Sequence, residues 1–375
     1  MKKRIAILGS TGSIGKTTLD IVKRYSDEFS VVLLANGANR EKLQEQIKEF
    51  KPEVAFCSDG YLMVNGEEVA FDKDYLAKKE TYANIDVIVN GIVGVAGLAP
   101  TLAVIDAGKV LCTANKESFV VAGNLINDRL TNSTTKIHPM DSEHSTVWQC
   151  IDDINNVKKI VLTASGGAFR DLSKDKLAEA KAEDALKHPT WVMGKKVTID
   201  CATLMNKGME IIEAMHIFKT KDIDVVMHRE SIVHSLVMMK DNTLIAGLSH
   251  PDMTIPIQYS LFYPQRKQSS VKELDLAEII SLNFGKIDED RFPCFRICKE
   301  VARHGDYAGC VMNAANEVLV EAYINDKIKF FDIPNGIISA LNQFGYEGKI
   351  DSVDDVLSID REVKEYTLNS IYEVR

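Results

Sequence analysis

A glycine-rich turn close to the start of the chain constrains the fold more than any other feature. The segment IAILGSTGSIGKTTLD places Gly9, Gly12 and Gly15 between a β-branched run and a helical pattern. Glycines at a strand-to-helix turn let the backbone approach a phosphate group, and the start of the helix offers free N–H groups and the positive end of its dipole. Two kinds of nucleotide site use such a turn, and they belong to different enzymes.

The spacing of these glycines distinguishes the two kinds of site. A phosphate loop of the ATPase type has four residues between its first glycine and Gly-Lys-Thr, whereas five separate Gly9 from Gly15. A later strand, IDVIVN, also ends in Asn90 instead of the Asp that would hold magnesium. The spacing G-x-x-G-x-x-G is one residue longer than the commonest dinucleotide motif but keeps its physical basis. The turn therefore favours a dinucleotide site, and a tight turn without a ligand is the structural alternative.

The second strand indicates which dinucleotide is bound. NAD sites usually carry an Asp or Glu there, which bonds the ribose hydroxyls. The segment VVLLANGANR has no acid and contains Asn36, Asn39 and Arg40. A missing carboxylate beside a guanidinium suits a 2′-phosphate, so we expect NADPH.

The order of strand and helix patterns predicts an α/β protein. In residues 1–150, β-branched runs alternate with helical stretches, which predicts a Rossmann-like, doubly wound parallel sheet that binds NADPH. Residues 151–264 mix strands with a helical stretch and are expected to form a central α/β domain with a lid at 165–195. A polar connector is expected at 265–291 and a C-terminal helical domain at 292–375. A chain of 375 residues suits two or three domains.

Composition argues against several classes of partner and compartment. The net charge is −9 and no long basic run occurs, so we expect no nucleic acid partner. The start, MKKRIAILGS, is too short in apolar residues for a signal peptide, and no window approaches 18 apolar residues. Seven scattered cysteines without a CxxC pair favour a reducing compartment. We therefore expect a cytoplasmic protein with no membrane partner.

Two acidic residues in MDSEHS are candidate metal ligands. Asp141 and Glu143 are two positions apart, and on an extended segment both carboxylates would point the same way and share one cation. A solvated acidic loop is the alternative. The segment CATLMNKGMEIIEA, if helical from about Thr203, adds Asn206, Lys207 and Glu210 on one face of a largely apolar helix. These groups suit phosphate and metal binding side by side, and a surface salt bridge is the alternative.

Two further segments contain candidate polar groups. Ser165 follows a strand in TASGGAFR and is a plausible second phosphate contact. His188 and Trp191 lie in the turn-rich KHPTWVMGKK, which suits a lid with an aromatic anchor as well as it suits an ordinary loop. His228 and His234 are interpreted first as core histidines and only second as hydrogen-bond donors to a ligand.

Seven motifs in order resemble one known family. GSTGSIG, ANKES, DSEHS, SGGAFR, HPTWVMGKK, NKGMEIIEA and NAANEV occur across residues 9–318, and the chain is similar over essentially its whole length to the 1-deoxy-D-xylulose-5-phosphate reductoisomerases. The resemblance implies a V-shaped homodimer that acts on a sugar phosphate and uses NADPH and one Mg²⁺, Mn²⁺ or Co²⁺ ion. It also implies that the central domain, residues 151–264, is the catalytic domain. The implied metal ligands are Asp141, Glu143 and Glu210.

The same resemblance implies roles for other residues. Lys116, Glu143, His188 and Glu210 are the implied catalytic residues. The implied substrate contacts are Lys116, Ser142, Ser165, His188, Trp191, Cys201, Asn206 and Lys207. The implied NADPH contacts are Thr11, Gly12, Ser13, Ile14, Gly37, Asn39, Arg40, Asn115, Glu117 and Gly194.

Two positions depart from the family pattern. Cys201 stands where the family usually has serine, and Ala38 stands where lysine is common. Neither change removes an implied metal ligand, and the second places more weight on Asn39 and Arg40 for the 2′-phosphate.

The activity that the resemblance implies is rearrangement and reduction of 1-deoxy-D-xylulose 5-phosphate to 2-C-methyl-D-erythritol 4-phosphate, in non-mevalonate isoprenoid synthesis. An aldehyde dehydrogenase of the aspartate-semialdehyde type shares a similar glycine turn and would use Cys150 as nucleophile. A non-catalytic NADP sensor is a third possibility. Of the three, only the reductoisomerase would lose turnover on metal chelation.

Overall fold

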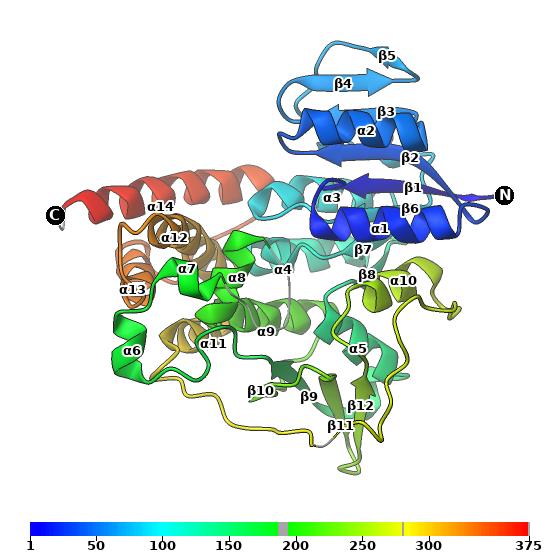
Figure 1. The fold of residues 1–375 in the computed structure, drawn as a ribbon. Helices are drawn as coiled ribbons and strands as arrows, with labels where there is room; N and C mark the ends of the chain where they lie inside the picture. Colours follow the sequence, from blue (N-terminus) through cyan, green and yellow to red (C-terminus); the bar gives the residue numbers. More distant parts are fainter. Residues whose placement is uncertain (187–193, 280, 374–375) are drawn as a thin grey trace. The chain divides into compact units, whose positions relative to one another are not determined.

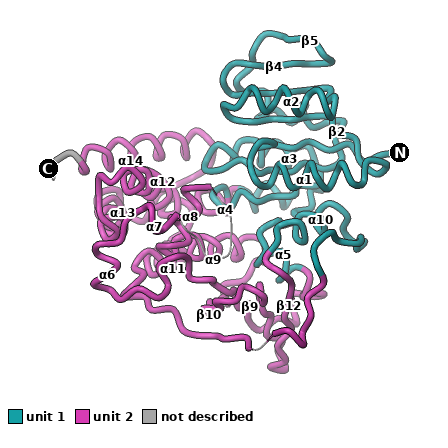
Figure 2. Tube along the Cα trace, viewed as in Figure 1, with its two compact units in different colours: residues 1–118, 126–148, 252–272 teal, residues 119–125, 149–251, 273–375 magenta. Residues whose placement is uncertain are grey.

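The computed structural model describes residues 1–186, 194–279 and 281–373 and divides into two compact units (Figures 1 and 2). Unit 1 comprises Met1–Ser118, Ile126–Trp148 and Asp252–Lys272. Unit 2 comprises Phe119–Leu125, Gln149–Pro251 and Glu273–Arg375. Both units are discontinuous in sequence, and the finer division into three domains with a connector remains a proposal.

Unit 1 is built on an eight-stranded sheet in the order β5-β4-β3-β2-β1-β6-β7-β8. Strands β1 to β3 and β6 to β8 run parallel, whereas β4 and β5 are antiparallel additions at one edge. The predicted parallel, doubly wound sheet is confirmed. Its strands are β1 (Lys3–Leu8), β2 (Phe29–Asn36), β3 (Val54–Cys57), β4 (Tyr61–Val64), β5 (Glu67–Glu68), β6 (Val87–Asn90), β7 (Val110–Thr113) and β8 (Lys136–Pro139).

Alternation along the central strand explains why helices cover both faces of this sheet. Ile5 and Ile7 of β1 join one buried cluster, whereas Ala6 and Leu8 join a second cluster on the opposite face. Helices α1 and α10 contribute to the first cluster and α3 to the second. The helices of unit 1 are α1 (Ser13–Arg24), α2 (Arg40–Phe50), α3 (Leu98–Asp106) and α10 (Thr254–Phe262), together with most of α4 (Lys116–Thr131) and of α5 (Ser142–Cys150).

Unit 2 contains a four-stranded mixed sheet in the order β10-β9-β11-β12. The pair β10 and β9 is parallel, and β11 is antiparallel to both β9 and β12. The strands are β9 (Val157–Ala164), β10 (Ile223–Met227), β11 (Val233–Met239) and β12 (Leu244–Leu248).

Much of the rest of unit 2 is helical, and the expected helical character of the C-terminal region is confirmed. Apolar residues of α11, α12 and α13 are buried, and α12 packs against both α13 and α14. The helices are α6 (Lys174–Ala178), α7 (Ala182–Ala185), α8 (Lys195–Ala202), α9 (Met205–Phe218), α11 (Pro293–His304), α12 (Asp306–Ile324), α13 (Asp332–Phe344) and α14 (Val353–Glu373). Short 3₁₀ turns occur at Tyr75–Ala77, Lys79–Tyr82, Val95–Gly97 and Ile154–Asn156.

Across the described part of the chain, no helix is both long enough and apolar enough to cross a membrane.

Candidate active site

The glycine turn of unit 1 has the geometry that a bound phosphate requires. Gly9 has φ +81°, and a Cβ at this position would lie 2.5 Å from the carbonyl oxygen of Gly91. A Cβ at Gly15 would overlap the Gly9 carbonyl. Helix α1 starts after Gly12 with no side-chain cap and no acidic residue in its first turn. The N–H groups of this turn are therefore suited to an anion, and the implied contacts Thr11, Ser13 and Ile14 lie in the turn and the first residues of α1.

The end of β2 lacks a carboxylate, as the sequence indicates. The Asn36 amide donates to the Asn39 carbonyl at 2.6 Å, and the Asn39 side chain accepts from the Lys42 N–H at 3.0 Å as the N-cap of α2. The guanidinium of Arg40 lies over the Tyr61 ring at 4.2 Å and pairs with Glu68 at 3.5 Å. The adjacent Gly37 is exposed, and its carbonyl oxygen accepts two bonds from Ser58, at 2.8 and 3.0 Å.

Asn115 fixes the start of α4 within unit 1. Its side chain is fully buried, and its amide donates to the carbonyls of Ile92 at 2.8 Å and Gly94 at 2.9 Å. A Cβ at Gly97 would lie 2.5 Å from Asn115 Oδ1, so the glycine permits this close approach. The buried Glu117 follows, 3.3 Å from the same amide nitrogen. The Asn115 side chain thus holds the loop after β6 against α4.

The expectation that Asp141 and Glu143 lie on an extended segment is wrong. Strand β8 ends at Pro139, and α5 begins at Ser142, so Glu143 lies in the first turn of a helix. The Asp141 carboxylate accepts from the Glu143 N–H at 3.2 Å, and its carbonyl accepts from the Ser145 N–H at 2.8 Å. Asp141 therefore acts as the N-terminal cap of α5, and this cap, rather than alternation along a strand, holds its carboxylate beside Glu143.

Within unit 1, one ammonium group and one hydroxyl group contact the carboxylates of these two acids. Lys116 Nζ is 2.9 Å from Asp141 Oδ2, and the Ser142 hydroxyl donates to the Glu143 carboxylate. The Lys116 and Asp141 side chains are only 12% and 13% exposed, so the ion pair is largely shielded from solvent. Unit 1 thus gathers two carboxylates, a hydroxyl and an ammonium group at the carboxyl ends of its parallel strands.

In unit 2, Ser165 and Cys201 are brought together by a glycine turn. Ser165 directly follows β9, and Gly166 and Gly167 take φ values of +84° and +63°. A Cβ at Gly167 would lie 2.6 Å from the Cys201 carbonyl oxygen, so only glycine permits this contact. Two of the implied phosphate contacts therefore lie on adjoining backbone segments.

The helix expected from about Thr203 begins slightly later. Helix α8 ends at Ala202 and α9 begins at Met205, because Leu204 takes a left-handed conformation with φ +58°. The turn places Cys201 at the end of one helix and Asn206 near the start of the next. A Cβ at Gly208 would collide with Cys298, so this glycine allows α9 to pack closely on α11.

The first turns of α9 hold the predicted polar trio. The Asn206 amide donates to Glu210 Oε1 at 2.6 Å, and the Lys207 ammonium pairs with the other carboxylate oxygen. The Lys207 and Glu210 side chains are 6% and 2% exposed. The alternative of a surface salt bridge is therefore wrong, because this pair is buried. Burying such a pair is costly unless the groups serve a purpose or are fully bonded.

Other predictions fall outside this site or outside the described residues. His188 and Trp191 lie outside them, as does part of the lid expected at 165–195, whereas Gly194 is the N-cap of α8. His228 is fully buried, with Nδ1 2.9 Å from the Asn283 carbonyl, which agrees with a core histidine.

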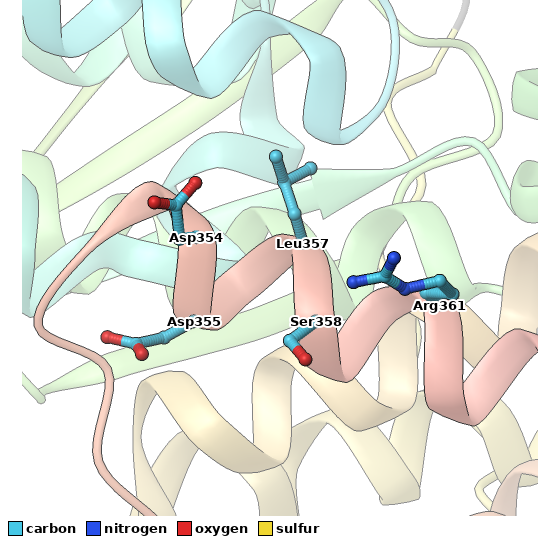
Figure 3. Close-up of a pocket in the computed structure, with 5 residues that line it drawn as sticks. All are labelled: Asp354, Asp355, Leu357, Ser358 and Arg361. Atoms are coloured by element: carbon cyan, nitrogen blue, oxygen red, sulfur yellow. The ribbon is translucent and has the colours of Figure 1, made fainter.

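A hollow beside the first turns of α14 is separate from these residues (Figure 3). No implied site residue is among those that line it, which are Asp354, Asp355, Leu357, Ser358 and Arg361.

One buried polar group beside the site was not singled out by the sequence interpretation. Asp200 is 1% exposed and directly precedes Cys201. Asn316 of the NAANEV motif donates to it at 2.9 Å. The motif was noticed, but 116 residues separate the partners and no spacing rule links them.

Family models match three parts of the chain. The model described as 1-deoxy-D-xylulose 5-phosphate reductoisomerase matches residues 5–123, and the model of that enzyme's C-terminal domain matches residues 137–218. A third, DXP reductoisomerase C-terminal domain, matches residues 248–366.

Curated relatives and solved structures agree with these models. A 1-deoxy-D-xylulose 5-phosphate reductoisomerase of Microcystis aeruginosa is 41% identical over 98% of each chain. One of Geobacillus sp. is 41% identical over 97% of this chain and 98% of its own. A crystal structure of DOX-P reductoisomerase in complex with NADPH, fosmidomycin and magnesium has a TM-score of 0.93 at 35% identity, covering 99% of both chains. The Zymomonas mobilis enzyme in complex with NADPH has a TM-score of 0.88 at 31% identity, again covering 99% of both chains.

The parallel sheet with its glycine turn and the carboxylates at its strand ends define a dinucleotide-binding fold with a polar site suited to a cation. Within that class, the full-length similarity identifies the family: the chain belongs to the 1-deoxy-D-xylulose 5-phosphate reductoisomerases.

Proposed function

We propose that this chain uses NADPH and a divalent cation to convert 1-deoxy-D-xylulose 5-phosphate into 2-C-methyl-D-erythritol 4-phosphate, a reductoisomerase step of isoprenoid synthesis. The observation that carries the proposal is 41% identity over nearly the whole length of curated enzymes with this name. A solved structure of a relative, which matches this chain with a TM-score of 0.93, contains NADPH, magnesium and fosmidomycin. The site chemistry described above agrees with the same activity.

The cation is assigned to Asp141, Glu143 and Glu210. Carboxylate oxygens suit hard cations such as Mg²⁺ and Mn²⁺, and Co²⁺ remains a further candidate. The helix cap that holds Asp141 beside Glu143 supports the first two ligands. Glu210 is a buried carboxylate on α9, already bonded to Asn206 and Lys207. Anionic ligands with fixed orientations of this kind fit a cation well.

NADPH is assigned to the glycine turn and the end of β2. The open N–H groups at the start of α1 suit the pyrophosphate, and Asn39 with Arg40 suits the 2′-phosphate. The Asn115 amide is engaged with the loop after β6, so its contribution is to hold the loop and α4 in place beside the cofactor.

The substrate phosphate is assigned to Ser165, Cys201, Asn206 and Lys207. The close approach of Gly167 to Cys201 supports grouping the first two, and the α8–α9 turn supports adding the last two. Lys116 and Ser142 are assigned to the substrate hydroxyls beside the acids they already contact. Binding the phosphate at a distance from the reacting carbons helps to orient them.

When bound, the cation supplies Lewis-acid stabilisation of the ketone and hydroxyl oxygens, and NADPH supplies hydride to the rearranged aldehyde. The residues of this chain orient both partners. Lys207 and Asn206 hold the phosphate end, and the Lys116 ammonium offsets the negative charge of Asp141 while the substrate is absent. His188 and Trp191 are proposed to shield the reacting carbons from water, as a lid would.

We further propose that the chain forms a homodimer in the cytoplasm. Strand β12 lies at the edge of its sheet, and Leu244, Ile245 and Leu248 are 51%, 39% and 39% exposed. An exposed apolar edge strand favours pairing with a second chain. Sedimentation of wild type and Ile245→Lys tests this: a monomeric wild type would contradict it, and a dimer weakened by the lysine would support it.

The direct test is NADPH oxidation with 1-deoxy-D-xylulose 5-phosphate, with and without EDTA. We expect turnover that chelation abolishes and added Mg²⁺ or Mn²⁺ restores. Turnover that ignores EDTA but requires Cys150 would favour the aldehyde dehydrogenase alternative. NADPH binding without turnover on this substrate would favour a sensor.

A further inference from the structure

Asp200 is a buried carboxylate whose two oxygens are bonded to different elements of unit 2. Oδ1 accepts from the Asn316 amide of α12 at 2.9 Å, and Oδ2 pairs with Lys196 Nζ of α8 at 2.7 Å. Asp200 and Asn316 are 1% and 0% exposed, whereas the Lys196 side chain is 21% exposed. An ionised carboxylate in such surroundings is stable only when it is paired and hydrogen-bonded. The side chains of Asn316, Asp200 and Lys196 therefore form one hydrogen-bonded cluster.

Asp200 is tied directly to the turn that precedes α9. It immediately precedes Cys201, and its carbonyl accepts from the Thr203 hydroxyl at 3.2 Å. The same hydroxyl accepts from the Met205 N–H at 3.3 Å. Leu204, between them, takes the left-handed conformation that leucine rarely adopts, so the turn depends on its surroundings to persist.

The residues assigned to the phosphate lie on both sides of this turn. Cys201 precedes it, Asn206 and Lys207 follow it, and the Gly167 backbone packs against the Cys201 carbonyl. A shift of α8 against α12 would move all of these groups together. The bond from Asn316 to Asp200 resists that shift because it joins the two helices where the turn begins.

The charge of Asp200 gives Lys196 a second role. A carboxylate beside a phosphate subsite would repel a dianionic ligand, and the repulsion is stronger in a shielded environment. Pairing with Lys196 at 2.7 Å neutralises Asp200, so this carboxylate adds no uncompensated negative charge beside the phosphate.

We infer that Asn316 and Lys196 are positioning residues for the phosphate end of the substrate and that they act through Asp200. The Asn316–Asp200–Lys196 cluster fixes the α8–α9 turn and neutralises the charge of Asp200 beside it. The inference rests on the proposed function, because it takes the phosphate of that substrate as the ligand. It gives a role to the NAANEV motif, which the metal and cofactor sites do not use.

The primary experiment exchanges the two buried partners. Asn316→Asp alone places two carboxylates in contact, and we expect at least a tenfold rise in KM for 1-deoxy-D-xylulose 5-phosphate with kcat and the KM for NADPH changed less than threefold. Asp200→Asn combined with Asn316→Asp restores one donor and one acceptor, and we expect it to recover most of the lost affinity. A KM unchanged in Asn316→Asp, or no recovery in the double variant while it remains folded, would overturn the inference.

Asn313→Ala is the matched control. Asn313 is equally buried, lies one turn earlier on α12 in the same motif, and bonds Glu317 of its own helix at 3.2 Å. We expect Asn313→Ala to lower Tm without changing the KM for the substrate, whereas the matched truncation Asn316→Ala should raise that KM. If Asn313→Ala raises that KM as much as Asn316→Ala does at a similar loss of Tm, the effect is general destabilisation of α12 and the inference fails.

The charge role has a separate test. Lys196→Met should raise the KM for the substrate about tenfold, and adding Asp200→Asn should lower it again because the uncompensated charge is gone. The converse result, a double variant weaker than Lys196→Met, would overturn the charge role.

A readout without turnover separates this inference from the proposed function. Inorganic phosphate should slow alkylation of Cys201 in wild type, as measured by peptide mass spectrometry, and should protect it at least fivefold less in Asn316→Asp. Equal protection in both proteins would contradict the inference. A wild type that phosphate protects but that does not turn over the substrate would instead contradict the proposed function.

Discussion

Lys116 Nζ lies 2.9 Å from Asp141 Oδ2, in a pair whose side chains are 12% and 13% exposed. In unit 2 the ammonium of Lys207 likewise forms an ion pair with the Glu210 carboxylate. Two acids assigned to the cation thus each have a lysine counter-ion within their own unit. A cation that binds these acids competes with the lysines, and each displaced ammonium becomes available to an anionic or hydroxyl group of the substrate.

The first prediction concerns this competition. Lys116→Met should tighten Mn²⁺ binding about tenfold, or about 1.4 kcal/mol, because it removes the positive charge that competes for Asp141. At the same time kcat should fall, since Lys116 is assigned to the substrate. Mn²⁺ affinity is measured by calorimetry without substrate, and Lys109→Met, which replaces a half-buried lysine bonded to a backbone carbonyl, is the control. Unchanged or weaker Mn²⁺ binding would show that Lys116 does not compete with the cation.

The second prediction removes a proposed metal ligand. Glu210→Gln should lower kcat at least a hundredfold, on the order of 3 kcal/mol of lost transition-state stabilisation. NADPH affinity, measured by fluorescence titration, should change less than twofold, because the glycine turn belongs to the other unit. Glu179→Gln, on an exposed side chain of unit 2, is the control. A near-normal kcat at saturating Mg²⁺ would exclude Glu210 as a ligand.

The sequence was sufficient to predict those structural features that depend on the spacing of nearby residues. The Gly9 turn and the alternation of strands with helices in residues 1–150 follow from short-range patterns, and both were predicted. The start of α5 was also marked in the sequence, because an Asp at the cap position followed by a Glu in the first turn is a helix-start signal. The expectation of an extended segment there overlooked that signal.

Features set by tertiary contacts could not be predicted from the sequence. Leucine has no preference for the left-handed conformation that Leu204 adopts, so nothing local marks the end of α8. The return of residues 252–272 to unit 1 depends on packing of α10 against α1. The bond between Asp200 and Asn316 joins positions that no periodicity connects. In the last two cases the deciding interaction joins residues that lie far apart along the chain.

The third prediction concerns cofactor choice. Arg40→Ala should raise the KM for NADPH about tenfold and hardly change that for NADH, because only NADPH carries the 2′-phosphate. The Arg40 guanidinium lies over the Tyr61 ring and 3.5 Å from Glu68, so it is held in place at the start of α2. Steady-state kinetics with both cofactors provide the measurement. Equal use of NADH and NADPH by the wild type, or parallel changes in the variant, would contradict this role.

The fourth prediction is a pH dependence of stability. Burial lowers the pKa of His216 to about 4, whereas an unfolded histidine titrates near 6.5. Between these values the unfolded chain binds the extra proton, so stability falls as pH drops from about 6.5 to about 4. The loss from this group should be about 2 kcal/mol at pH 5.

Urea unfolding at pH 7.5 and pH 5.0 tests this, with His216→Gln as the variant. The wild type should lose about 2 kcal/mol more than the variant over this range. Asp306, 4.0 Å from the imidazole, accepts from the N–H groups of Asn124 and Leu125 and is present in both proteins. His304→Gln, which replaces an exposed histidine, should lose as much stability between pH 7.5 and pH 5.0 as the wild type does. An equal loss in wild type and His216→Gln would contradict the assignment.

The last prediction concerns the departure at Cys201. A thiol is a weaker hydrogen-bond donor than the hydroxyl usual in this family. A hydrogen bond to a charged group contributes about 1.5–3 kcal/mol, and the thiol should supply only part of it. Cys201→Ser should therefore lower the KM for the substrate about fivefold, or about 1 kcal/mol, if KM follows affinity.

The structure sharpens the test of Cys201. The residue is partly buried at the end of α8, and the Gly167 backbone packs against its backbone carbonyl, a contact that the change to serine leaves in place. The KM for NADPH should stay constant, because most of the proposed cofactor contacts, including the glycine turn, belong to unit 1. Substrate should also protect Cys201 of the wild type from alkylation, whereas protection of the half-buried Cys150 is not expected. An unchanged KM together with an absence of protection would mean that position 201 does not contact the phosphate in this chain.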